Sequence, residues 1–195
     1  MSSQAQATLT FHPLGPERFQ DLEALFGPRG GCGGCWCMHW RRTAREYEAG
    51  KGARNHNALR ALVAAGRPLG VLAFQGGDPV GWCAVSPRAD FVRLAASRIL
   101  APVDDAPVWS IVCLFVARAH RRAGVSVGLL RAACAYAAAH GAPAVEAYPV
   151  EPRTDEVPDV FAFTGLRSAF DRAGFREIGR RAPTRPIMRW WPAGS

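Results

Sequence analysis

Runs of apolar residues with few polar interruptions mark the expected strands of this chain. Residues 109–116 form the most apolar run, which predicts a central strand covered on both faces. Two shorter apolar runs, residues 69–74 and 80–85, are joined by the glycine-containing residues 75–78, which predicts a hairpin. Residues 7–13 alternate between apolar and polar and predict an opening strand. The chain therefore begins a sheet that leads to its most apolar segment.

Helical spacing appears between and after these runs. It predicts helices over residues 17–26, 43–49, 55–65, 90–100, 127–140 and 166–173. Further strands are expected at residues 144–150, 175–180 and 186–191, the last of them as an edge strand. The order of strand 109–116, helix 127–140 and strand 144–150 predicts a β-α-β unit whose two strands run parallel. The pattern is therefore that of the α/β class.

The 195 residues are within the usual size of one compact domain, and they contain no internal repeat or long linker. We therefore expect a single domain over residues 1–195, with residues 1–6 flexible. No segment approaches the ~18 uncharged apolar residues that are needed to cross a bilayer. The polar start lacks the basic-then-apolar order of a signal peptide, so we expect a cytoplasmic protein with no membrane partner.

The formal net charge of +8 at pH 7 comes mostly from arginine and favours anionic partners. Three explanations of this positive charge compete: binding to nucleic acid, binding to a phosphate-rich cofactor, and a basic coding background without specific meaning. The basic residues are dispersed and none of the usual nucleic-acid-binding motifs is present, so we expect no nucleic-acid partner. By charge repulsion alone, the same excess favours an acidic or neutral acceptor over a polycation.

A short basic turn, residues 117–126, connects the most apolar run to the helix that follows it. Backbone N–H groups at a helix N-terminus lack partners within the helix, and the helix dipole adds partial positive charge there. Gly124 leaves room for an anion near the backbone, while Arg121 and Arg122 add full charges. A solvated arginine-rich loop would have the same composition. Taken alone, such a short Gly and Arg pattern favours the solvated loop, and only its context in the chain changes that interpretation.

This turn resembles the signature of the GNAT superfamily of N-acetyltransferases. The signature is Arg or Gln, two residues, Gly, one residue, and then Gly or Ala. Arg121, Gly124 and Ser126 stand at these places, and Ser126 is a departure that keeps a small residue. Arg118 and Arg122 are departures too, since the family usually has Pro and Gly there.

Two further segments extend the resemblance, which covers residues 7–190. Residues 80–82 are similar to the family's third strand, and residues 168–175 to its last helix and the strand after it. The resemblance implies a twisted, mixed and mostly antiparallel sheet with a central parallel β-α-β unit, flanking helices and acetyl-CoA as co-substrate. The residues that it assigns to the cofactor are Leu114, Phe115, Val116, Arg121, Arg122, Ala123, Gly124, Val125, Ser126, Val127 and Gly128.

The resemblance is less complete for the catalytic groups. A backbone N–H near Leu114 would polarise the acetyl carbonyl, so catalysis would depend on positioning and on stabilising an oxyanion. Many family members have a tyrosine acid where this chain has Phe170, and an asparagine where it has Phe163. The residues that could replace them are Tyr148 and Ser168 as the acid, and Glu146 and Asp105 as the base.

The most unusual stretch is a cysteine cluster, Cys32, Cys35 and Cys37, with His39 close behind. Four such ligands are enough in number for a tetrahedral zinc site. Structural sites usually draw their ligands from two separated pairs, so we expect a packed loop and no metal. The residues expected to shape the substrate pocket are Trp36, Met38, His39 and Trp40. The cysteines expected to be buried are Cys83, Cys113 and Cys134.

Three functions are compatible with these features. The first is acetyl-CoA-dependent transfer of an acetyl group to a primary amine of a small molecule or peptide. The second, motivated by Phe170 and Phe163, is a non-catalytic acyl-CoA-binding or sensor module on the same fold. The third is a metal or redox regulator built on the cysteine cluster. The identity of the acceptor stays open, and Trp190 and Trp191 could form a homodimer contact.

Overall fold

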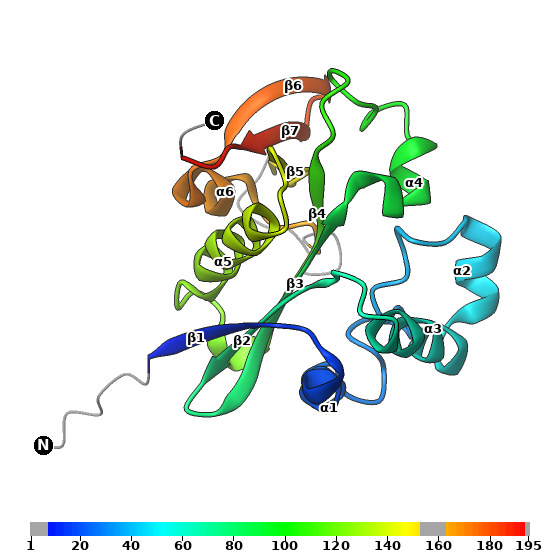
Figure 1. Cartoon of the computed structure of the whole chain (residues 1–195). Helices are drawn as coiled ribbons and strands as arrows, with labels where there is room; N and C mark the ends of the chain where they lie inside the picture. Colours follow the sequence, from blue (N-terminus) through cyan, green and yellow to red (C-terminus); the bar gives the residue numbers. More distant parts are fainter. Residues whose placement is uncertain (1–7, 153–162, 194–195) are drawn as a thin grey trace, which may run out of the picture.

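The computed structural model describes residues 8–152 and 163–193, in which strands and helices form a layered α/β fold (Figure 1). The flexibility expected for residues 1–6 lies outside the described residues. The strands are β1 (Leu9–Pro13), β2 (Gly70–Gln75), β3 (Asp78–Pro87), β4 (Trp109–Val116), β5 (Val145–Ala147), β6 (Arg176–Ala182) and β7 (Arg185–Trp190). The α-helices are α1 (Phe19–Phe26), α2 (Ala44–Gly50), α3 (Ala53–Ala64), α4 (Val92–Ala95), α5 (Val125–Ala139) and α6 (Arg167–Ala173). The 3₁₀ turns are η1 (Pro16–Arg18), η2 (Arg88–Asp90) and η3 (Arg118–His120).

Within the described ranges the strands form one mixed sheet in the order β1-β2-β3-β4-β5-β7-β6. Strands β4 and β5 run parallel, and the other neighbouring pairs run antiparallel. This confirms the mostly antiparallel sheet and the parallel β-α-β unit that the sequence predicts. The parallel pairing covers three residue pairs, from Trp109 opposite Val145 to Ile111 opposite Ala147. The second half of β4 therefore continues without β5 beside it.

The sheet separates two apolar layers. Helices α5 and α6 cover one face, and α1 to α4 lie on the other side (Figure 1). On the α5 side, Leu129 and Ala133 pack with Val71 and Ile111 of the sheet, all nearly inaccessible to water. Side chains along one strand alternate between the two faces, so Leu72 and Val112, the neighbours of these strand residues, enter the other layer. The largest fully buried side chain of that layer is Trp82 of β3.

Local signals explain where several elements begin. Thr43 precedes α2 and forms a capping box with Glu46: the Glu46 N–H donates to the Thr43 hydroxyl at 3.4 Å, and the Thr43 N–H donates to the Glu46 carboxylate at 3.0 Å. Gly124, with φ of 79°, ends the basic turn and starts α5. Because residues with a Cβ rarely adopt this conformation, Gly124 fixes the point where the turn becomes a helix.

Three predicted elements differ from the structure. The helix expected at residues 90–100 is reduced to η2 and α4. Beyond α4, the Leu100 N–H donates to the Ser97 hydroxyl at 3.2 Å, whereas in a helix it would donate to a backbone carbonyl of the preceding turn. The strand expected at residues 144–150 stops at Ala147, shortly before Pro149, which has no N–H for a ladder. The strand expected at the sheet edge, β7, lies between β5 and β6, because the hairpin of β6 and β7 folds back beside β5.

Candidate functional site

A long cleft of about 1190 Å³ opens beside the second half of β4, where β5 no longer pairs with it. One end is formed by the basic turn and the start of α5, and the other by the loop that follows α1. The residues that line it are Phe26, Gly30, Gly31, Cys32, Cys35, Cys37, His39, Tyr47, Cys113, Leu114, Phe115, Val116, Arg118, His120, Arg121, Arg122, Val125, Ser126, Pro152, Phe163, Gly165, Leu166, Ser168, Ala169 and Arg172.

The formally charged side chains in the described lining of the cleft are all cationic. Four arginines face the cleft, and none of the described residues that line it is an aspartate or glutamate. Three of the four, Arg118, Arg121 and Arg122, belong to the basic turn. Arg121 also donates from Nε to the carbonyl of Val116 at 3.3 Å, so its stem follows the end of β4. An anion that enters this end of the cleft therefore meets several cations and the N-terminus of α5.

The predicted cofactor residues divide into two groups. Leu114, Phe115, Val116, Arg121, Arg122, Val125 and Ser126 line the cleft, whereas Ala123, Gly124, Val127 and Gly128 do not. Gly128 has a packing role, because a Cβ at this position would collide with the ring of Phe11 on β1. At Gly124 a Cβ would meet open space, so its requirement for glycine is conformational and does not come from crowding.

The backbone N–H of Leu114 already has a hydrogen-bond acceptor in the structure. The Leu114 N–H donates to the carbonyl of Phe163 at 2.7 Å across the gap that β5 leaves beside β4. The prediction that this N–H polarises an acetyl carbonyl therefore requires the Phe163 contact to open. Phe163 itself lines the cleft, at the place where the resemblance would put asparagine.

The cysteine loop is tightly folded against the core. Trp36 and Met38 are buried, and neither is among the residues that line the cleft or the smaller cavity described below, so the geometry gives no support to the prediction that they shape the substrate pocket. The cause is backbone geometry: Trp36 and Cys37 have φ of 45° and 53°, which turns the Trp36 ring inward to lie 5.8 Å from Phe26. The Phe26 ring in turn meets Phe115 of β4 at 5.4 Å. The loop therefore supports the floor of the cleft.

The three cysteines of this loop, Cys32, Cys35 and Cys37, line the cleft. In the part of the chain that the structure describes, no group of three or more His, Cys, Asp or Glu side chains is placed to hold a metal. The Trp82 indole N–H donates to Cys37 Sγ at 3.0 Å. Contact with Cys113 and burial raise the pKa of the Cys37 thiol, which keeps it protonated. Cys83 and Cys134 are buried as predicted, but Cys113 is half-buried and lines the cleft.

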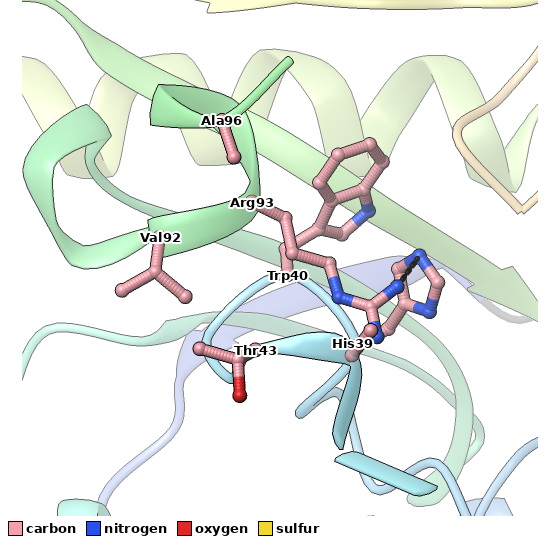
Figure 2. A pocket seen from close by; sticks show the side chains of 7 residues that line it. His39, Trp40, Thr43, Val92, Arg93 and Ala96 are labelled. Carbon is pink, nitrogen blue, oxygen red and sulfur yellow. Dashed lines mark hydrogen bonds between the residues drawn. The ribbon is translucent and has the colours of Figure 1, made fainter. Parts of the chain in front are cut away.

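A second, smaller cavity of about 420 Å³ adjoins the cleft, and His39 is the residue common to their described linings. The other residues around it are Trp40, Thr43, Ala44, Val92, Arg93 and Ala96. Figure 2 shows Arg93 reaching from α4 toward His39, with its Nη1 3.3 Å from the imidazole Nε2. Burial and the charge of Arg93 lower the pKa of His39 from its usual 6.5, so the ring is neutral at pH 7.

Tyr47 is a site residue that the sequence analysis did not single out. It lines the cleft from α2, and its ring centroid lies 5.1 Å from that of His39. Burial raises the pKa of Tyr47 to about 12, with nearby thiols adding to the effect. The side chain is therefore a protonated phenol at the inner end of the cleft. The capping box at Thr43 was a signal for the helix, but no local pattern indicates which of its faces meets the cleft.

The other predicted catalytic groups lie away from the inner end of the cleft. Tyr148 and Glu146 are almost inaccessible to water, and the Tyr148 hydroxyl donates to the Glu146 carboxylate at 2.9 Å. Neither lines the cleft, and this position argues against the roles predicted for them. Asp105 is exposed, also outside the cleft, whereas Ser168 lines it from α6. Phe170 is buried against Phe175, with ring centroids 5.1 Å apart.

We expect the Glu146 network to stabilise the fold. Arg189 Nη2 lies 2.6 Å from Glu146 Oε1, and Arg88 Nη1 lies 3.3 Å from Oε2. Replacing Arg189 with methionine leaves a buried carboxylate with one cation, which should lower the free energy of unfolding by about 3 kcal/mol. Urea denaturation measures this change.

Lys51→Met is the control, because Lys51 pairs with Glu48 at 2.7 Å on the exposed surface and its loss should cost less than about 1 kcal/mol. Equal effects of the two substitutions would contradict the structural role of the network.

The fold and the cleft together define a class of protein. The sheet is mixed, and its two parallel strands, β4 and β5, separate near the N-terminus of the helix that connects them. This is the fold of the GNAT acetyltransferases. The sequence model of the acetyltransferase (GNAT) family matches residues 36–157, more than half of the chain. The chain therefore belongs to this family, whose enzymes use acetyl-CoA. Within the described residues no helix has both the length and the apolar character that crossing a membrane requires.

Solved structures share the fold across nearly the whole chain. A GNAT-family acetyltransferase from Listeria monocytogenes is 12% identical, with a TM-score of 0.57 over 98% of this chain and 99% of that one. AAC(6′)-Ib, solved with paromomycin and acetyl-CoA, is 15% identical, with a TM-score of 0.55 over 94% and 93%. The PaiA N-acetyltransferase from Thermoplasma acidophilum, solved with coenzyme A, is 13% identical, with a TM-score of 0.52 over 95% and 99%. No curated protein sequence matches the chain.

Proposed function

We propose that this protein transfers the acetyl group of acetyl-CoA to a primary amine of a small molecule or peptide. The observation that supports this most directly is the cleft itself, which carries four arginines and, among its described residues, no carboxylate. A cofactor with several phosphates matches this charge. The length of the cleft matters as well, because it runs from the start of α5 to His39 and Tyr47.

In this proposal the cofactor lies along β4. The amides that open α5, together with Arg121 and Arg122, hold the diphosphate, and Val125 and Ser126 face it. The pantetheine arm follows Leu114, Phe115 and Val116 in the gap that β5 leaves. The thioester then reaches the inner end, beside the cysteine loop. The acetyl-CoA is a co-substrate, and the proposal needs no metal ion.

His39 and Tyr47 are the proposed proton-transfer groups. Nε2 of His39 accepts a hydrogen bond from Arg93 in the structure, so this contact opens before His39 acts as a base. The amine then attacks the thioester carbonyl and gives a proton to His39, which the structure keeps neutral. The C–S bond breaks, the departing thiolate takes a proton from Tyr47, and the proton on His39 passes to the Tyr47 oxygen, so that both groups return to their starting forms. The two rings are 5.1 Å apart, so both groups reach one reacting centre. Ser168, at the other wall, is the alternative acid.

Tyr47→Phe should lower kcat on the order of 10²-fold, with little change in the KM for acetyl-CoA, because the hydroxyl acts on the departing thiolate. Steady-state release of thiol measures this change. Tyr136→Phe is the matched control, since the Tyr136 ring packs against Trp109 and His140 outside the cleft. If Tyr47→Phe keeps full activity and Ser168→Ala loses it, Ser168 is the acid.

The proposal as a whole is tested on the unmodified protein. Calorimetry should detect binding of acetyl-CoA, and thiol should be released in proportion to acetylated amine when a panel of primary amines is added. Binding without turnover on any amine would overturn the proposal in favour of an acyl-CoA sensor. Absence of binding would overturn both.

A further inference from the structure

The smaller cavity has features that restrict what can bind there. Its wall is largely apolar, with Trp40, Val92, Ala44 and Ala96 around it, and Arg93 is its one cation within the described lining. Figure 2 shows Val92 and Ala96 on one side and the rings of Trp40 and His39 on the other. Because His39 also lines the cleft, a molecule in this cavity lies next to the proposed site of acetyl transfer.

The guanidinium of Arg93 is held in place but has no anionic partner. Its Nε donates to the carbonyl of Arg42 at 3.1 Å, and its Cζ lies 5.2 Å from the centroid of the Tyr47 ring. Among the described residues, no carboxylate forms an ion pair with Arg93, and Nη2 makes no hydrogen bond. A positioned guanidinium with unused donors is suited to binding a carboxylate.

Nearby carboxylates are engaged elsewhere. Glu46 accepts a hydrogen bond from the Thr43 hydroxyl at 2.7 Å, as part of the capping box of α2. Glu48, whose charge also reaches His39, pairs with Lys51 at 2.7 Å. The cavity therefore offers the unused guanidinium donors of Arg93 and its positive charge, and its described lining provides no group to neutralise a second cation on a ligand.

We propose that the smaller cavity binds the acceptor, and that the acceptor carries a carboxylate close to its amine, as in an α- or β-amino acid with an apolar side chain. This inference rests on the proposed function. The carboxylate pairs with Arg93, the apolar side chain lies against Trp40 and Val92, and the amine points to His39. The 3.3 Å between Arg93 Nη1 and His39 Nε2 suits an amine and a carboxylate on the same or adjacent carbons. A polyamine would instead bring its second ammonium to Arg93.

The test compares acceptors that differ only in the carboxylate. L-phenylalanine, L-phenylalaninamide and 2-phenylethylamine share one aromatic body, and L-leucine with L-leucinamide forms a second set. After correction for the fraction of neutral amine, kcat/KM should be at least about tenfold higher for the two acids. Arg93→Gln should abolish this preference and leave the KM for acetyl-CoA unchanged, while Arg93→Lys should retain part of it.

The outcomes separate this inference from the function on which it rests. Equal kcat/KM values for acids and amides, or a preference that survives in Arg93→Gln, would overturn the carboxylate site and leave acetyl transfer intact. Failure of every amine to release thiol would overturn the proposed function and this inference with it. The affinity of each variant for acetyl-CoA shows whether it has folded.

Discussion

Replacing Gly124 with glutamate is expected to weaken acetyl-CoA binding by about 100-fold or more. Gly124 is the N-cap of α5 and precedes Val125 and Ser126 of the cleft, so a carboxylate there lies beside the place where the proposal puts the diphosphate. The new charge repels the phosphates and competes for the same N–H groups. An acidic residue at a helix N-terminus also interacts favourably with the helix dipole, which offsets part of the strain at this positive φ. Calorimetric titration with acetyl-CoA measures the loss.

Gly124→Ala is the matched control for this substitution. It imposes the same backbone strain, about 1 kcal/mol, but adds no charge, and its Cβ meets open space. Its affinity for acetyl-CoA should therefore stay within a few-fold of that of the unmodified protein. If glutamate and alanine at this position bind the cofactor equally well, the diphosphate does not rest at the start of α5.

The sequence predicted those parts of the fold that local signals determine. Strand β4 has the bounds expected for it because a run of apolar residues ends at a basic turn. The hairpin of β2 and β3 follows from the glycines between them. Residues 90–100 are different: Phe91, Leu94 and Leu100 are all buried, but only Leu94 packs into the core from a helix, the short α4, while Phe91 and Leu100 lie outside it. Spacing alone cannot separate this arrangement from a helix.

The candidate site shows the same division. Its cofactor end lies on one continuous segment, from Leu114 to Ser126, so the order of residues indicates it. Its inner end combines the loop after α1, helix α2 and α4, which meet only through tertiary packing. The sequence therefore predicts the helix that carries Tyr47 but not the place of Tyr47 in the site. The place of Tyr148 at a strand end predicts an acid there, but Arg88 and Ser110 bind its hydroxyl inside the fold.

Replacing His39 with glutamine is expected to lower kcat on the order of 10³-fold, because the amine then loses its base. The pH dependence provides a second signature. The pKa of His39 is lowered below 6.5, so the basic form is present at pH 7 and is lost only as the pH falls through this reduced value. For the unmodified protein, kcat at saturating substrates should therefore fall on the acidic side and reach half of its plateau at a pH below 6.5.

In His39→Gln the fall of kcat at low pH, the acidic limb of the profile, should disappear because glutamine does not titrate. The residual rate should then be independent of pH. The variant should bind acetyl-CoA normally, since Arg121, Arg122 and the start of α5 are unchanged. His140→Gln, at the far end of α5, is the control and should keep both the rate and the limb. If His39→Gln retains the acidic limb, another group accepts the proton. The lowered pKa would then reflect only the burial of His39 beside Arg93.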